Sequence, residues 1–438
     1  MILMKFGGSS LADPERIRAV GRIVRARMKD RPVVVVSAFR GVTDALLQAA
    51  QDALRGDLRG LVPLKRRHLE SARALKAPAS LVEGLFSELE GLLRGVSLLK
   101  ELTPRTLDRA ASFGERLSAR LVAAHFIRQG LKARAVDAFD AGLLTDDRFG
   151  GANPLPRADR AIRRHLGRAR FLPVLTGFIG KTASGDITTL GRNGSDYSAT
   201  IFGAALGARE VQIWSDTDGV MTADPRLVPD ARPIAELSFS EASELAYYGG
   251  KVLHPHTLLP AVRKGIPIRV LNTFKPDHPG TAILAERSAA EPGARSISFK
   301  KRQRIVSVSS PRMVLGAGFL GRIFGAFGRH DVAVDMVSTS EVTVSASVGA
   351  PRGLAAAISE LKGEFRVRVE EGRSVICIVG DGIGSTPGVA GTIFEALREA
   401  KVNVEMISQG ASEINIAFVV RDADCPRAVR ALHRSLFS

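Results

Sequence analysis

Residues 1–18 read MILMKFGGSSLADPERIR, and this opening indicates how the fold begins. A short apolar run over residues 2–6 ends at two glycines, and a Pro14 in the first turn of the next segment is typical of a helix start. A basic amphipathic helix is expected from there to about residue 29. Residues 33–37 have the composition of a strand buried on both faces. Strand, glycine turn, helix and strand predict a βαβ unit and a parallel sheet.

The same kind of pattern continues through the first two thirds of the chain. Further strand-like runs occupy residues 133–137, 171–176, 210–215 and 268–271, and residues 45–128 are largely helical in pattern. We therefore expect one α/β domain over residues 1–285. Residues 286–304 have no clear periodicity and contain Pro292, so we expect a linker there.

The remaining sequence repeats itself. GFLGRIF at 318–324 is followed by VAVDMVS at 332–338, and GVAGTIF at 388–394 is followed by VNVEMIS at 402–408. Each copy has a strand-like run before it, at residues 305–309 and 375–379, and an alternating strand after it, at residues 342–348 and 414–420. A repeat this close predicts two small α+β modules of the same fold, over residues 305–374 and 375–438.

Composition narrows the class of protein. With 438 residues, of which 45% are hydrophobic, the chain is long enough for two or three domains. The net charge of +17 favours a polyanionic partner, but the basic residues are scattered and aromatics make up only 5%. We expect no nucleic-acid partner. Two cysteines form no disulfide framework, which fits a reducing cytoplasm, and no apolar stretch suits a membrane span.

Two glycine-rich segments have the composition of anion-binding loops. KFGGSS at residues 5–10 places a mobile cation, Lys5, beside glycines that let backbone N–H groups approach a phosphate. The alternative is a plain turn between strand and helix. GFIG and GDITTLGRNGSDYSA, over 177–199, form a denser loop in which Arg192 can clamp a carboxylate or phosphate. Asp196 could hold an ammonium, orient a lysine or only cap the helix.

Two further motifs are compatible with a site or with plain structure. Glu115, in SFGERLS at 112–118, is expected early in an amphipathic helix, where an acid is favourable in any case. WSDTDGVMTADPR at 214–226 is an acidic turn after a strand, where open α/β sheets bind ligands. GAGFLG at 316–321 matches a dinucleotide fingerprint only weakly. His254 and His256 lack a metal-binding spacing, and we expect no protein metal site.

Together the motifs resemble those of the aspartokinases of the amino-acid-kinase family. KFGGSS, a VSA…GVT turn, FGER, the GFIG…TTLGR-x-GSDYSA loop, WSDTDG and GGKVLHP carry the resemblance, which covers essentially the whole chain. The resemblance is closest to single-function, lysine-sensitive enzymes. It implies a three-layer αβα domain with a mostly parallel sheet, followed by two ACT domains of βαββαβ type. It also implies a homodimer or homotetramer that assembles through those ACT domains.

The resemblance further implies the reaction. The enzyme would transfer the ATP γ-phosphoryl group to the β-carboxylate of L-aspartate, the first step towards lysine, threonine and methionine, with L-lysine as feedback effector. A side-chain carboxylate is already ionised at neutral pH, so no general base is needed. Mg²⁺ would be held mainly by the ATP phosphates. The alternatives are another kinase of this fold acting on a different carboxylate, a catalytically silent amino-acid sensor, or a basic nucleic-acid binder.

The resemblance assigns roles residue by residue. The expected catalytic groups are Lys5, Asp196 and Lys251. The expected aspartate-binding residues are Thr43, Glu115, Arg192, Asn193, Gly194 and Ser195, with Arg192 on the α-carboxylate and Glu115 near the ammonium. The expected nucleotide site comprises Lys5, Phe6, Gly7, Gly8, Ser215, Asp216, Met221, Arg226 and Lys251. The expected effector site comprises Met313, Gly316, Phe319, Leu320, Ala333, Val334, Asp335, Ser340 and Glu341.

Three departures from the family pattern bear on these roles. Asn193 stands where the family usually has glycine in the aspartate loop, and asparagine tolerates left-handed geometry less freely than glycine. Met221 stands where a tyrosine often lines the nucleotide base. Gly316 and Ala333 stand where lysine-sensitive relatives often carry serines, which bears on the identity of the effector.

Overall fold

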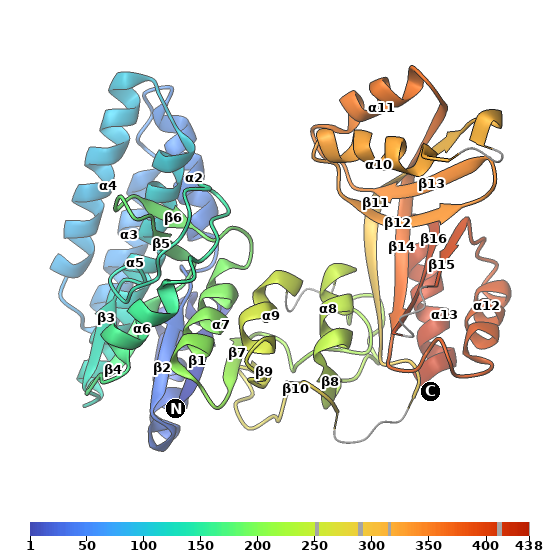
Figure 1. The fold of residues 1–438 in the computed structure, drawn as a ribbon. Coiled ribbons are helices and arrows are strands. Elements are labelled where there is room, and N and C mark those ends of the chain that lie inside the picture. The colour runs from blue at the N-terminus through green and yellow to red at the C-terminus, as the bar shows by residue number, and fades with distance from the viewer. Residues whose placement is uncertain (250–253, 288–291, 314–316, 410–413, 438) are drawn as a thin grey trace. The chain divides into compact units, whose positions relative to one another are not determined.

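The computed structural model describes residues 1–249, 254–287, 292–313, 317–409 and 414–437. The chain forms two compact units, each built from more than one segment (Figure 1). The first unit comprises Met1–Val220, Ala235–Phe239 and Val252–Arg287. The second comprises Met221–Ile234, Ser240–Lys251 and Ser288–Ser438.

The first unit alternates strands and helices, as the opening of the sequence predicts. Its strands are β1 (Ile2–Phe6), β2 (Pro32–Val36), β3 (Ala133–Val136), β4 (Leu172–Thr176), β5 (Ile179–Lys181), β6 (Ile187–Thr189), β7 (Val211–Ser215), β8 (Glu236–Ser238), β9 (Ile268–Asn272) and β10 (Thr281–Leu284). Its helices are α1 (Pro14–Ala26), α2 (Val42–Ala53), α3 (Leu61–Leu75), α4 (Ser80–Leu99), α5 (Pro104–Arg128), α6 (Ala158–Leu166), α7 (Gly194–Leu206) and α9 (Pro255–Val262). Short 3-10 turns cover Gly8–Leu11 and Met28–Asp30.

An eight-stranded sheet organises this unit, in the order β3-β4-β2-β1-β7-β9-β10-β8. Neighbouring strands are parallel except for β9 and β10. The mostly parallel αβα fold is therefore confirmed. The antiparallel β10 and the small β5–β6 hairpin were not expected, because strands of three or four residues carry little periodicity.

Side-chain alternation along β1 decides what each face of the sheet receives. Ile2, Met4 and Phe6 are buried in a core shared with α1 to α5. Because successive side chains of a strand point to opposite faces, Lys5 faces the other side, where α7 packs. One residue of β1 thus projects its ammonium group towards the helix that follows the Arg192 loop.

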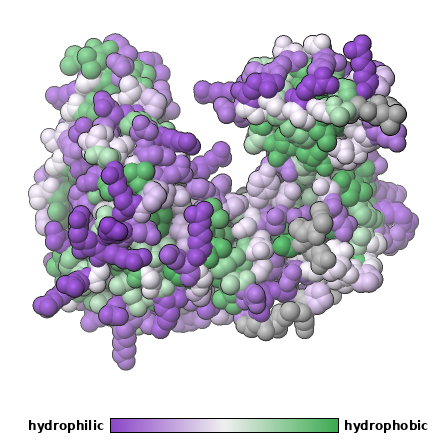
Figure 2. All heavy atoms as spheres, viewed as in Figure 1, coloured by the Kyte–Doolittle hydropathy of each residue, from purple (hydrophilic) through white to green (hydrophobic). Residues whose placement is uncertain are grey.

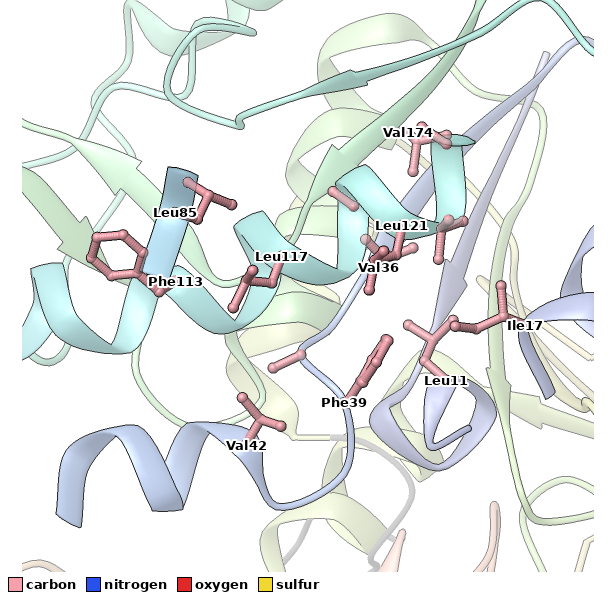
Figure 3. Packing of buried hydrophobic residues seen from close by; sticks show 14 of the residues in the cluster. Leu11, Ile17, Val36, Phe39, Val42, Leu85, Phe113, Leu117, Leu121 and Val174 are labelled. Atoms are coloured by element: carbon pink, nitrogen blue, oxygen red, sulfur yellow. The ribbon is translucent and has the colours of Figure 1, made fainter. Parts of the chain in front are cut away.

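The core on the α1–α5 side fixes the turn after β2. Figure 3 shows side chains of α5, including Leu117 and Leu121, converging with Val36 of β2 and with Phe39 in the turn that follows. All four side chains are at most 1% exposed. Full burial of such side chains stabilises the fold by about 1.5–3 kcal/mol each, so the turn that carries Phe39 is firmly held.

The second unit is built around one six-stranded antiparallel sheet, in the order β12-β13-β11-β14-β16-β15. Its strands are β11 (Ser296–Ser309), β12 (Val334–Thr339), β13 (Thr343–Val348), β14 (Arg366–Val379), β15 (Met406–Ser408) and β16 (Asn415–Arg421). Its helices are α8 (Phe239–Tyr247), α10 (Phe319–Arg329), α11 (Leu354–Lys362), α12 (Val389–Glu399) and α13 (Cys425–Phe437), with a 3-10 turn over Pro311–Met313. α8 belongs to it from Ser240 onward.

The two repeats share the long strands β11 and β14. The first part of β11, residues 296–300, pairs with residues 375–379, and its last part pairs with residues 366–370. Each repeat has its own core, one around α10 and α11 and one around α12 and α13. β11 begins at Ser296, inside the stretch expected as a linker. The sequence did not reveal this part of the strand, because its basic residues interrupt the alternation of apolar and polar side chains. The domain boundaries themselves stay a prediction.

The face of the molecule seen in Figure 2 differs between the two units. Figure 2 shows hydrophilic residues over most of the visible face of the first unit, and hydrophobic residues gathered over the strands of the second. Exposed apolar side chains of the second unit include Leu320, Val342 and Ile407. Among the described residues, no helix combines the length and apolarity needed to cross a membrane.

Candidate active site

A cavity of about 580 Å³ in the first unit is lined by three of the four motifs that the sequence singles out in residues 1–285, all but the acidic turn at 214–226. It receives Lys5 from β1, Gly8 from the turn that follows, Thr43 from the first turn of α2, and Glu115 from α5. The loop from Thr189 to Asp196 closes another side. Pockets of this size suit ligands of drug-like dimensions. The glycine turn and the Arg192 loop thus face one shared space.

An ion pair joins two of the expected catalytic groups. Lys5 Nζ lies 2.6 Å from Asp196 Oδ1, and both side chains are about one tenth exposed, at 11% and 10%. Asp196 is in the first turn of α7, so the helix fixes the carboxylate and the carboxylate fixes the ammonium. A lysine held in this way presents a localised positive charge to the cavity.

The glycine turn after β1 is shaped by close approach to its neighbours. The N–H of Gly7 donates to the carbonyl of Trp214 at 3.1 Å. A Cβ on Gly8 would lie 2.9 Å from the carbonyl oxygen of Ala38. Only glycine fits there, and Gly8 lines the cavity. Phe6 points into the core and stacks on Trp214 with ring centroids 5.8 Å apart, so only its backbone can reach a ligand.

Glu115 is a buried carboxyl group with one oxygen left over for a ligand. Its side chain accepts a hydrogen bond from the N–H of Ala38 at 3.0 Å, while Oε2 is buried without a hydrogen-bond partner in the described structure. Burial raises the pKa of Glu115 to about 8, although the Ala38 hydrogen bond and the nearby Lys5 oppose the shift. A cationic ligand group would satisfy Oε2 and stabilise the ionised form.

Asp108 also lines the cavity, and it was not among the residues expected there. Its carboxylate accepts hydrogen bonds from Gly150 N at 3.0 and 2.9 Å, from Thr189 N at 2.8 Å and from Thr189 Oγ1 at 2.8 Å. Burial raises its pKa, while these hydrogen bonds lower it. A single Asp between Leu107 and Arg109 carries no local signal, because its partners lie 42 and 81 residues away.

The Arg192 loop has the left-handed geometry that the family's glycine would suit. Asn193 has φ 54° and ψ 25°, and it directly precedes α7. Asparagine is among the few residues that adopt this region readily, so the substitution keeps the backbone path. Arg192 is exposed, and no ion pair to it occurs within the described parts of the chain. Ser195 is 8% exposed and follows in the first turn of the helix.

The other end of this loop is held by the segment after β4. A Cβ on Gly177 would lie 2.6 Å from the Cβ of Ser195, and a Cβ on Gly194 would lie 2.7 Å from the ring of Phe178. Ser198 Oγ accepts from the N–H of Phe178 at 2.9 Å. These contacts place Gly194 and Ser195, both expected to bind aspartate, at the cavity wall.

The expected nucleotide residues are only partly brought together. β1 and β7 are parallel and pair Phe6 with Trp214, so Ser215 and Asp216 follow at the same sheet edge as the glycine turn. Ser215 Oγ lies 3.0 Å from Thr217 Oγ1. Met221 and Arg226 belong to the second unit, where Arg226 pairs with Asp224 at 2.5 Å. Lys251 lies outside the described residues, and the roles of all these residues stay predictions.

The expected effector residues lie at two ends of one module. One end is where β11 ends and β13 begins, and there Ser310 N donates to Val342 O at 3.1 Å. The expected effector residues near this end are Met313, Phe319, Leu320, Ser340 and Glu341. Ala333, Val334 and Asp335 are at the opposite end of β12. At about 3.3 Å per strand residue, more than about 10 Å separates the groups. Gly316 lies outside the described residues.

Asp335 already has a cationic partner. Lys300 Nζ lies 2.8 Å from Asp335 Oδ1 and 4.1 Å from the ring centroid of Tyr247 on α8. The hydroxyl of Tyr247 donates to the carbonyl of Val334 at 3.3 Å. The Asp335 end of β12 is thereby tied to α8 within the second unit.

Comparisons with known proteins identify the family of the chain. Residues 1–272 match the amino acid kinase family and residues 376–436 match an ACT domain. The chain is 38% identical over 457 residues to aspartokinase 2, chloroplastic, of Arabidopsis thaliana, covering 99% of this chain and 84% of that protein. It is 34% identical over 458 residues to lysine-sensitive aspartokinase 3 of Escherichia coli, covering 100% and 99%.

Solved structures extend the similarity to the fold. E. coli aspartokinase III in complex with aspartate and ADP matches with a TM-score of 0.88 at 32% identity, over 100% of both chains. The same enzyme in complex with lysine and aspartate matches with a TM-score of 0.78 over the same coverage. The chain therefore belongs to the amino acid kinase family, among its aspartokinases.

Proposed function

We propose that the chain transfers the γ-phosphoryl group of ATP to the β-carboxylate of L-aspartate, giving 4-phospho-L-aspartate and ADP. The observation that carries this proposal is the shared cavity, in which the Lys5–Asp196 pair, Glu115 and the Arg192 loop meet. Two anions can be brought together there between the positive charges of Lys5 and Arg192. A pathway role at the start of lysine, threonine and methionine synthesis, in the cytoplasm, follows as an expectation.

The site offers aspartate one anchor for each of its non-reacting charges. Arg192, exposed at the cavity wall, would pair with the α-carboxylate through two parallel hydrogen bonds. Glu115 Oε2, which is buried without a hydrogen-bond partner, would accept a hydrogen bond from the ammonium group. Thr43, Gly194 and Ser195 line the remaining wall. The β-carboxylate is then free to point at Lys5.

Phosphoryl transfer then needs positioning and cancellation of charge rather than a base. A β-carboxylate oxygen forms a bond to the γ-phosphorus, and the bond from that phosphorus to the β,γ-bridging oxygen breaks, so that ADP leaves with the electron pair. Lys5, held by Asp196 at 2.6 Å, would offset the negative charge that spreads over the transferring group. No proton has to move in this step.

Mg²⁺ would enter on the phosphates of ATP and neutralise part of their charge. Among the described residues, no group of three or more His, Cys, Asp or Glu side chains is placed to hold a metal ion. Mg²⁺ commonly keeps water and phosphate oxygens as ligands, so the ion would be carried mainly by the phosphates of the nucleotide.

We further propose that lysine regulates the enzyme through the second unit. Its relative from E. coli is named lysine-sensitive, and that enzyme has been solved with lysine bound. The expected effector residues lie at opposite ends of β12, so one lysine molecule cannot contact all of them within one chain. A site completed by a second copy would join both ends, which supports a homodimer or homotetramer assembled through these modules.

An assay of ATP-dependent hydroxamate formation tests the proposed reaction. Aspartate, glutamate, N-acetylglutamate and asparagine are compared as acceptors, with and without lysine or threonine. The proposal predicts product from aspartate alone and inhibition by lysine. Product from another acceptor would favour a different kinase of this fold. Binding of amino acids without any ATP turnover would favour a silent sensor.

A further inference from the structure

We propose that Asp108 is a positioning residue that sets the place of Arg192, and therefore the affinity and selectivity for an acceptor bearing an α-carboxylate. This inference rests on the proposed role of Arg192 in holding aspartate. Asp108 is not one of the site residues that the sequence motifs predicted. It acts through the loop that it holds, without touching the substrate itself.

Asp108 connects three segments of the chain. It belongs to α5, Gly150 belongs to the loop after β3, and Thr189 ends β6. Three donors, two backbone N–H groups and one hydroxyl, all converge on this carboxylate within 3.0 Å. Arg192 follows Thr189 by three residues, so the start of its loop is fixed to α5.

A second contact supports the same loop from the Gly150 side. Gly191 has φ 75°, and a Cβ on it would lie 3.2 Å from the carbonyl oxygen of Gly150. Leu190 N donates to Phe178 O at 2.8 Å. Between Asp108 on one side and the segment after β4 on the other, residues 189–191 have little freedom. Arg192 is the first side chain of the loop that is exposed to the cavity.

The helix α5, which anchors the Arg192 loop through Asp108, also carries Glu115. Asp108 and Glu115 are seven residues apart, so they lie on the same face of the helix, about 10 Å apart along its axis. The helix therefore sets the separation between the carboxyl group that would meet the ammonium and the loop that would meet the α-carboxylate. The helix α5 would thus fix the spacing between the groups that bind the ammonium and the α-carboxylate of aspartate.

The hydrogen-bond inventory explains why Asp108 would not bind substrate itself. A carboxylate offers about four acceptor positions, and three donors already use most of them, since the Gly150 N–H is shared between both oxygens. An asparagine can direct its N–H₂ group only at the Thr189 hydroxyl, which can accept, but the negative charge is lost and the Gly150 N–H keeps one acceptor instead of two. Asp108→Asn is therefore expected to release the loop while changing little of the cavity's shape.

Steady-state kinetics of Asp108→Asn test the proposal. We expect the KM for aspartate to rise about tenfold or more, as small displacements of positioning groups do, with the KM for ATP and kcat within about threefold. Thr189→Val, which removes one of the three donors, should shift the same constant by a smaller factor. Asp186→Asn is the matched control, since Asp186 joins the same hairpin to α5 through Arg105 at 3.3 Å, on the exposed side.

The α-amide of aspartate separates positioning from general damage. It keeps the β-carboxylate but gives Arg192 no anion to hold, so Asp108→Asn should lower its turnover by less than about twofold. An equal loss on aspartate and on the amide, or a rise in both KM values together, would overturn the proposal. Arg192→Ala is run alongside. If Arg192→Ala leaves the KM for aspartate unchanged, the proposed substrate site is wrong. If Arg192→Ala raises this KM but Asp108→Asn leaves it unchanged, only the positioning role of Asp108 is wrong.

Discussion

The pH dependence of aspartate use gives a direct prediction from the burial of Glu115. Its pKa is raised to about 8 by burial, so below that pH the free enzyme holds this group mainly as the neutral acid. A neutral acid offers the substrate ammonium no counter-charge. Because the pKa of this acid is raised, aspartate capture should improve as the pH increases and the group ionises.

The size of the effect follows from the titration curve. With a pKa of about 8, roughly a tenth of Glu115 is ionised at pH 7 and roughly nine tenths at pH 9. The value of kcat/KM for aspartate should therefore rise about tenfold between these two pH values, since kcat/KM reports groups of the free enzyme. A coupled assay for ADP, at saturating ATP and low aspartate, measures it.

A substitution assigns the profile to this residue. Glu115→Gln should give a flat profile between pH 7 and 9, and at pH 9 a kcat/KM lower by about 10- to 100-fold, as expected for loss of a charge-assisted hydrogen bond. Glu83→Gln, on the exposed face of α4, is the matched control and should keep the wild-type rise. A flat wild-type profile, or an unchanged rise in Glu115→Gln, would refute the reasoning.

Substitutions at three other positions test separate parts of the account. Lys5→Met should lower kcat about 10²- to 10³-fold with little change in the KM for aspartate, in the same ADP assay, because it removes charge stabilisation at the phosphoryl group; a loss confined to KM would contradict this. Asn193→Gly should keep the KM for aspartate and change the free energy of unfolding by less than about 1 kcal/mol, while Asn193→Val should lower that free energy by about 1–2 kcal/mol in a denaturant titration. Lys300→Met should lower the inhibitory lysine concentration about tenfold, because it frees Asp335 from a 2.8 Å ion pair, whereas Lys301→Met should not. Equal inhibition of wild type and Lys300→Met would show that this pair does not compete with the effector.

Much of the first unit could be predicted because its strands are continuous apolar runs. Residues 2–6 and 33–37 each contain enough β-branched or large apolar side chains to identify a buried strand, and their parallel pairing followed from the helix between them. β5, β6 and β10 escaped because each has three or four residues. Tertiary pairing, rather than local pattern, defines strands of that length.

The length of β11 and β14 was hidden by a local irregularity. Sequence patterns indicated strands only at residues 305–309 and 375–379, whereas β11 continues back to Ser296 and β14 back to Arg366. The register shifts between Lys300 and Gln303, and Arg302 has φ 58°, so the alternation of side chains breaks there. A bulge of basic residues resembles a linker when the partner strand is not known.

The candidate site shows the same division between local and distant signals. Lys5 and Arg192 were found because each lies in a dense run of glycines and polar residues, which plain structure rarely requires. Asp108 was not found, because what makes it important is three donors brought to it by the fold. Glu115 was ambiguous from sequence, and its unpartnered Oε2 is visible only in three dimensions.

A crystal structure of the enzyme with aspartate and a non-hydrolysable ATP analogue tests the central claim most directly. The account predicts the α-carboxylate on Arg192, the ammonium on Glu115, and a β-carboxylate oxygen about 3–3.5 Å from the γ-phosphorus, beside Lys5. Aspartate bound outside this cavity, or turned with its α-carboxylate towards Lys5, would contradict it.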